Sequence, residues 1–175
     1  MRRLPIFLAL LATAAPVPAA AVEIAAQIFQ VTYREAGEER VGEDARVPYL
    51  PGNACYTWYL RAEPARSGFT VVERLILPQA VDWGTTGTVP DDPTRIEDGG
   101  IVAVTTMPTA TDASGWFNHG WCVAEGDPLG PHTIQLAIDD AEVARFKFEV
   151  VSPREYGIPA TFIHRPSNRS VNDSW

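Results

Sequence analysis

Two cysteines, Cys55 and Cys122, are the residues of this chain whose chemistry is easiest to infer. A pair of thiols in an oxidising compartment forms a disulfide, whereas the same pair in the cytosol usually stays reduced. The prediction of a disulfide between these two residues therefore depends on where the chain is sent, which the N-terminal residues indicate.

The N-terminal residues have the three parts of a secretory signal peptide. Arg2 and Arg3 form a short basic start, residues 6–15 are an apolar run, and Ala19 and Ala21 provide the small-x-small pattern that precedes a cleavage site. We expect cleavage after Ala21 and export to the periplasm or beyond it. An exported chain with two cysteines is in turn expected to carry a Cys55–Cys122 disulfide.

Charge and composition narrow the compartment and the partners. Lys147 is the only lysine beside many arginines, which is typical of a GC-rich bacterial genome and favours a Gram-negative periplasm. The formal net charge of −8 falls to about −10 once Arg2 and Arg3 are removed. Nucleic acid and anionic membrane surfaces both need basic patches, so neither is an expected partner. No later apolar run approaches the roughly 20 residues of a membrane span.

Aromatic side chains are the second set of residues that could do chemistry. Four of them could stack against sugar rings, as in a carbohydrate-binding module: Trp83, Trp116, Phe117 and Trp121. Such a platform needs coplanar rings exposed to solvent, whereas aromatic residues in alternating strands usually fill the core. Core filling is the main interpretation, and a ligand platform is the alternative.

The histidines and acids form no metal-binding or catalytic motif that we recognise. His119 and Cys122 are three residues apart, which in a strand places them on opposite faces. His132 and His164 lie far from them in sequence. The acids in residues 91–98 do not follow the EF-hand spacing and suit a solvated loop.

Gly-x-Ser-x-Gly and His-Glu-x-x-His motifs are both absent. We therefore expect no bound metal, no cofactor and no enzymatic activity.

Short strands must position these residues, and the clearest of them form a hairpin. Residues 132–138 and 144–150 alternate apolar and polar side chains around Asp139 and Asp140, as the two strands of an antiparallel hairpin do. Further strands are expected at residues 22–34, 55–62, 69–77, 101–107 and 116–124.

The segments between these strands are expected to be irregular. Residues 35–42 are charged and turn-like, and residues 47–53 contain too much proline and glycine for a central strand. Residues 79–100 are expected to form a long loop, and long loops are common places for function.

Seven or eight short strands with little or no helix predict an all-β, antiparallel sandwich. We expect a signal peptide at 1–21, one domain at 22–164 and a flexible tail at 165–175. An early cysteine, a late cysteine and a final hairpin after Gly126-Asp127-Pro128 resemble an immunoglobulin-like sandwich. The pattern is also similar to small exported bacterial domains of unassigned function.

The resemblance covers residues 55–151 and implies an architecture without an active site. The sequence departs from the antibody pattern at two places. No tryptophan lies about a dozen residues after Cys55, and Gly120 stands where that family has a tyrosine.

The faces of the two cysteine strands leave two arrangements open. Aromatic and aliphatic side chains, including Trp58 and Trp121, lie on the faces opposite Cys55 and Cys122. Either the disulfide lies outside the main core and joins neighbouring strands, or it is buried and the aromatic faces are exposed. Burying a large aromatic removes about 150–250 Å² from water, which favours the first arrangement.

Two functional hypotheses follow from the sequence. The first is an exported, non-enzymatic interaction or accessory domain whose edge strands or long loop bind an envelope protein. The second is a carbohydrate-binding module whose exposed tryptophans bind a glycan. The sequence leaves the oligomeric state open.

Overall fold

The computed structural model describes residues 22–84, 86–87 and 93–159 of the chain. The expected signal peptide at 1–21 and the expected tail at 165–175 lie outside the described residues. The elements are β1 (Glu23–Glu35), β2 (Glu38–Gly42), β3 (Arg46–Pro48), β4 (Ala54–Glu63), β5 (Phe69–Ile76), β6 (Thr94–Glu97), the 3-10 turn η1 (Asp98–Gly100), β7 (Val102–Thr109), β8 (Trp116–Cys122), β9 (Gly130–Ile138), β10 (Ala141–Val151) and α1 (Pro153–Tyr156).

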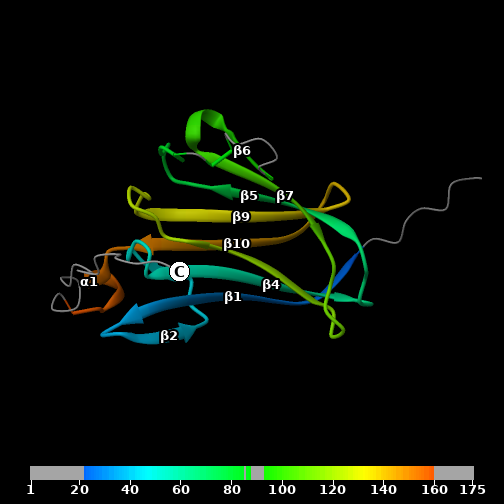
Figure 1. The fold of residues 1–175 in the computed structure, drawn as a ribbon, viewed down its shortest axis with the longest axis horizontal. Helices are drawn as coiled ribbons and strands as arrows, with labels where there is room; N and C mark the ends of the chain where they lie inside the picture. The colour runs from blue at the N-terminus through cyan, green and yellow to red at the C-terminus, as the bar shows by residue number, and fades with distance from the viewer. Residues whose placement is uncertain (1–21, 85, 88–92, 160–175) are drawn as a thin grey trace, which may run out of the picture.

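Two sheets face one another and form a sandwich (Figure 1). The four-stranded sheet has the order β2-β1-β4-β8, and the six-stranded sheet has the order β3-β10-β9-β5-β7-β6. The strand pairs are antiparallel except for the short β3, which runs parallel to β10. The predicted all-β sandwich is confirmed, with more strands than the seven or eight expected.

The core lies between the sheets and follows the alternation of the sequence. On β4 the side chains of Tyr56, Trp58 and Leu60 are buried, and the residues between them are only partly covered. On β10 Phe148 is buried and Lys147 is exposed. The aromatic faces are therefore inside, which is the arrangement that burial favoured.

Strand β2 corrects the prediction of a turn-like segment at residues 35–42. The turn occupies only Ala36 and Gly37, which both have positive φ, and β2 then pairs with β1. All five residues of β2 are exposed, so no apolar alternation marks it in the sequence. Its backbone ladder to β1, rather than burial, holds it in place. Similarly, β6 and η1 form the last part of the predicted loop at 79–100.

The helix α1 is one turn long and is fixed at both ends. The Ser152 hydroxyl accepts a hydrogen bond from the Glu155 backbone N–H, and Gly157 ends the turn in the left-handed conformation. Tyr156 docks edge-on against Tyr33 at 5.2 Å between ring centroids. Among the described residues no helix is long and apolar enough to cross a membrane.

Candidate functional site

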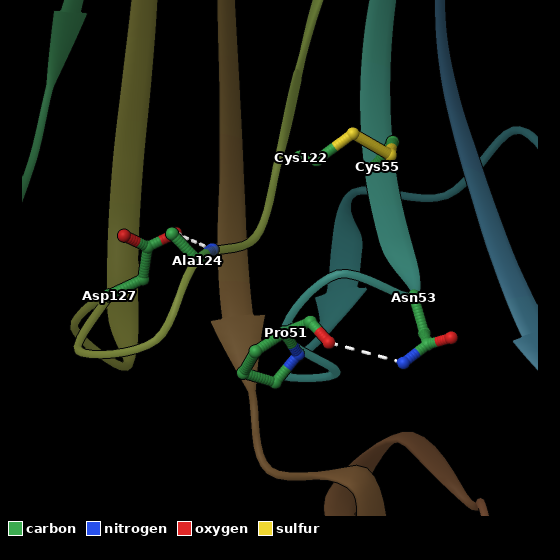
Figure 2. The surroundings of a disulfide bond; sticks show 6 residues. All are labelled: Pro51, Asn53, Cys55, Cys122, Ala124 and Asp127. Carbon is green, nitrogen blue, oxygen red and sulfur yellow. Dashed lines mark hydrogen bonds between the residues drawn. A yellow bond between two sulfur atoms is a disulfide. The ribbon is translucent and has the colours of Figure 1, made fainter. Parts of the chain in front are cut away.

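The disulfide lies on the outer face of the four-stranded sheet and joins neighbouring strands. Cys55 on β4 and Cys122 on β8 are directly opposite in the antiparallel ladder, with Cα atoms 3.8 Å apart. Figure 2 shows the bond near the end of both strands, beside Pro51, Asn53 and the Ala124–Asp127 turn. The disulfide expected between these cysteines is therefore present, and it ties β8 to β4.

The inner face of β8 meets a buried carboxylate. Glu73 on β5 has no solvent exposure, and its carboxylate accepts hydrogen bonds from the indole N–H groups of Trp58 and Trp121. The Nδ1 atom of His119 lies 3.1 Å from Oε2 of the same carboxylate. We call these four residues the Glu73 cluster: Glu73, Trp58, His119 and Trp121. Three side chains from β4 and β8 thus converge on one acid from the opposite sheet.

Burial explains why the carboxylate needs so many partners. Removing a carboxylate from water costs several kcal/mol unless hydrogen bonds replace the lost hydration. In the described part of the chain, every buried side-chain nitrogen and oxygen has a hydrogen-bond partner. His119 is 32% exposed and forms the solvent side of the cluster. The cluster therefore fixes the inner face of β8 by directed hydrogen bonds.

A polar row continues from Glu73 across the six-stranded sheet. Glu73 pairs with Thr105 on β7, and Thr105 pairs with Thr94 on β6, so the three side chains share one face. The hydroxyl oxygens of Thr105 and Thr94 are 2.9 Å apart. The row therefore runs from β5 through β7 to β6, which is an edge strand of the six-stranded sheet.

The four aromatic residues of the candidate ligand platform do not form one flat surface. Trp83 meets Trp121 edge to face, with centroids 6.1 Å apart and an interplanar angle of 68°. Phe117 is buried and packs edge-on against Trp58. Trp116 alternates with Phe117 along β8 and therefore points to the other face of the sheet. The coplanar surface that the glycan hypothesis requires is not built by these residues.

The outer edge of β8 leaves backbone groups open. The Ala62 N–H donates to the Gly115 carbonyl at one end of the β4–β8 ladder, and the Val123 N–H donates to the Ala54 carbonyl at the other end. These two bonds fix which backbone groups of β8 face β4. Because backbone direction alternates, the N–H and C=O groups of Asn118, Gly120 and Cys122 point away from β4. Among the described residues, these groups have no backbone or side-chain partner.

The backbone groups of Trp116 also point away from β4, but Asp112 pairs with them at the start of the strand. Its N–H donates to the Asp112 carboxylate at 2.9 Å, and its carbonyl accepts from the Asp112 N–H at 2.8 Å. The open part of the β8 edge therefore runs from Asn118 to Cys122.

The other edge strands of the described sheets are protected in ways that β8 is not. β2 consists of exposed residues that include Glu38, Glu39 and Arg40. β3 is three residues long and ends at Pro48, and β6 is four residues long and carries ion-paired Arg95. By contrast, β8 is seven residues long and has neither an acid, a lysine, an arginine nor a proline. Charge, proline and shortness are the usual protections of an edge strand against strand addition, although the shortness of β3 also leaves part of β10 unpaired.

The acids that could suggest a calcium site are not brought together in the described residues. Asp91 and Asp92 lie outside those residues. Hydrogen bonds from Arg95 and Arg74 lower the pKa of the half-buried Glu97 carboxyl. No group of three or more potential metal ligands occurs in the part of the chain that the structure describes.

Sequence reasoning did not find the Glu73 cluster. A signal for it is present, because Glu73 is in phase with Phe69, Val71 and Leu75 on the buried face of β5. An acid in an apolar phase must find donors inside the protein. Which donors it finds depends on the packing of the two sheets, and strand alternation does not specify that packing.

Comparison with known proteins gives a family and distant structural likenesses. The family model described as the PM0630 beta sandwich domain matches residues 26–151. A solved immunoglobulin-like protein from Pseudomonas aeruginosa is 12% identical, with a TM-score of 0.49, and the alignment covers 75% of this chain and 98% of that one.

The second solved structure is the alkylpurine DNA glycosylase AlkC of Pseudomonas fluorescens, bound to DNA that contains an abasic site analogue. It is 10% identical with a TM-score of 0.39, and the alignment covers 75% of this chain and 30% of that one. No curated protein matches the chain. Neither structural likeness is close enough to carry a function to this chain.

Proposed function

We propose that this chain, which belongs to the PM0630 β-sandwich domain family, is an exported, non-enzymatic domain that binds an extended segment of an envelope protein along β8. The observation that carries the proposal is the open, uncharged edge formed by Asn118, Gly120 and Cys122. An extended segment that adds to such an edge gains main-chain hydrogen bonds along its length.

The attachment of β8 to its own sheet supports this role. The Cys55–Cys122 bond holds one end of β8 against β4, and the Glu73 cluster holds His119 and Trp121 from the inner face. An edge that is fixed before binding loses little conformational entropy when a partner strand adds to it. The same attachments make it costly for an incoming strand to displace β8 from β4.

Export is supported by two features that agree. The first residues have the pattern of a cleaved signal peptide, and the structure contains a disulfide, which persists in oxidising compartments. An envelope partner follows from that compartment. A non-enzymatic role is supported by the β-sandwich architecture, with a side-chain cluster whose acid is fully buried and saturated with donors.

A proline at position 118 tests the proposal at the edge itself. The Asn118 N–H faces away from β4, so Asn118→Pro removes an outward donor and adds bulk at the edge while sparing the β4 ladder. Asn118→Ala is the matched control, since it shortens the same side chain and keeps the N–H. The purified variants are used to capture proteins from a periplasmic extract, and the captured protein is then titrated against each variant.

We expect wild type and Asn118→Ala to bind the same protein equally. Asn118→Pro should bind it at least about tenfold more weakly, the equivalent of about 1.4 kcal/mol. Amide hydrogen exchange at Gly120 and Cys122 should slow in the wild-type complex. Full binding by a folded Asn118→Pro protein, or unchanged exchange at these amides, would refute strand addition at β8.

A further inference from the structure

We propose a second binding site on the opposite side of the sandwich, where the free half of β10 takes an extended segment of a partner protein and a cavity beside it receives one arginine side chain. The site is formed by β10, by β1 and by the connection between β2 and β3. It shares no residue with the β8 edge and stands independently of the function proposed for that edge.

The backbone of β10 is open over half its length. β3 pairs only with Glu149–Val151, and the first bond of that ladder joins Glu149 N–H to the Ala45 carbonyl at 2.8 Å. Because backbone direction alternates, the N–H and C=O groups of Arg145 and Lys147 point to the same edge. In the described part of the chain these groups have no partner, so the edge offers donors and acceptors to an added strand.

A cavity of about 250 Å³ lies directly beside this open edge. Its lining residues are Phe29, Glu43, Asp44, Ala45, Phe146 and Lys147. The volume is below the roughly 300–1,000 Å³ of sites that enclose a small molecule. It suits a single long side chain that projects from a segment already paired with β10.

The walls of the cavity favour a side chain with an apolar stem and a cationic head. Phe29 and Phe146 lie 5.7 Å apart between ring centroids and offer aromatic surface to a stem and to a guanidinium. Glu43 is exposed and has no ion pair among the described residues, whereas the Asp44 carboxylate already binds the Arg46 guanidinium at 3.6 Å and the Arg46 N–H at 2.9 Å. Glu43 is therefore the acid available to a ligand.

Lys147 does not remove this preference. It follows Phe146 along a strand, so its side chain points to the outer face and its backbone faces the edge. A purely apolar ligand side chain would partly desolvate Glu43 without giving it a partner, which is unfavourable. The formal net charge of −8 also steers basic segments toward the protein. Arginine combines an aliphatic stem with a planar cation that stacks on aromatic rings and donates to carboxylates.

Two capped peptides test the site with the full mature protein. The first has the sequence Thr-Val-Thr-Arg-Thr-Val-Thr, and the second has norleucine in place of arginine, which keeps an apolar stem and removes the cation. Titrations of isotope-labelled protein are followed by NMR. We expect shifts at the amides of Arg145 and Lys147, and about fivefold tighter binding of the arginine peptide, as one exposed cation–π and ion-pair contact would give.

Variants separate this site from its surroundings. Glu43→Gln should reduce the preference for the arginine peptide to less than about twofold. Glu39→Gln removes the same charge from exposed β2, away from the cavity, and should keep the preference. Asn118→Pro should leave both affinities unchanged, so failure of the β8 proposal and failure of this one are distinguishable. Equal binding of the two peptides, shifts confined to β8, or no shifts would overturn the proposal.

Discussion

The interior of the sandwich is stabilised in different ways on its β10 side and on its β8 side. On the β10 side, Phe29, Tyr56, Phe146 and Phe148 pack in stacked and tilted pairs with centroids 4.6 to 6.0 Å apart. On the β8 side, a buried carboxylate is held by two indoles and a histidine in the Glu73 cluster. Burial of apolar surface, which depends little on the angles between rings, stabilises the β10 side. Hydrogen bonds, which require particular directions, stabilise the β8 side.

The difference predicts how each side fails when it is altered. An aromatic stack that loses a ring leaves a cavity, and the cost follows the volume lost. A hydrogen-bonded cluster that loses an acceptor keeps its shape but leaves buried donors unsatisfied. Substitutions of matched size on the two sides therefore separate packing from hydrogen bonding.

The largest expected effect is on the β10 side. Phe148 is 4% exposed and contacts Tyr56 and Phe29, so Phe148→Ala should lower the free energy of unfolding by about 3–5 kcal/mol. Lys147→Ala, one residue away on the solvent face, should change it by no more than about 0.5 kcal/mol. Urea denaturation of both variants measures the contrast. Comparable losses would mean that the last strand is buried on both faces.

Loss of the disulfide should have the next largest effect, on the edge of the β8 side. The double variant Cys55→Ser, Cys122→Ser should be about 2–4 kcal/mol less stable, because the bond closes a long loop in the unfolded chain. Urea denaturation measures the loss. Thiol titration of the denatured wild-type protein provides the control and should find essentially no free thiol. Two titratable thiols in exported protein would contradict the disulfide.

The Glu73 cluster is tested by a substitution that keeps its shape. Glu73→Gln replaces one carboxylate oxygen by an NH2 group, which turns one indole contact into donor against donor. We expect a loss of about 1–3 kcal/mol. Glu97→Gln, which breaks surface ion pairs with Arg74 and Arg95, is the control and should cost no more than about 1 kcal/mol. A Glu73→Gln protein as stable as the control would show that directed bonds do not hold the β8 side.

The alternation of the sequence was sufficient to predict the aromatic side. Phe146 and Phe148 lie in one phase and Arg145 and Lys147 in the other, and the structure keeps this division. Stacking depends on burial, and burial is what a period of two residues reports. The sequence also limited the disulfide to one pair, because the chain has only two cysteines.

Features held by long-range geometry were not predictable in the same way. β2 is polar on every side, so only its pairing with β1 defines it. The bonds to Glu73 come from residues 15, 46 and 48 positions away in the chain. Their convergence depends on which strand lies over which when the sheets pack. The cavity beside β10 likewise lies where no strand pairs with that part of β10, because β3 begins only at Arg46, opposite Glu149. No pattern in the sequence marks where this pairing begins.

The smallest expected effect concerns a titratable ring within the aromatic side. His132 is 3% exposed, stacks on Phe148 at 5.2 Å, and its Nδ1 lies 2.9 Å from the Gly130 carbonyl oxygen. Burial lowers the pKa of His132 below its usual 6.5, against opposing effects of the Gly130 hydrogen bond and the Asp127 charge. The fold therefore favours the neutral ring.

The direction of the pH dependence follows from this lowered pKa. Above about pH 6.5 the ring is neutral in both the folded and the unfolded chain, and its contribution to stability is fully present. As the pH falls below that value the unfolded chain binds a proton first, so the free energy of unfolding decreases until the folded pKa is passed.

Urea denaturation of wild type and His132→Gln between about pH 5.5 and 7.5 measures this pH dependence. The wild-type curve should fall more steeply toward acid, and subtracting the variant's curve removes the contributions that the two proteins share. Parallel curves would mean that the packing around Phe148 tolerates a protonated His132 ring as well as a neutral one. Charge would then not distinguish the aromatic side from the side of the Glu73 cluster.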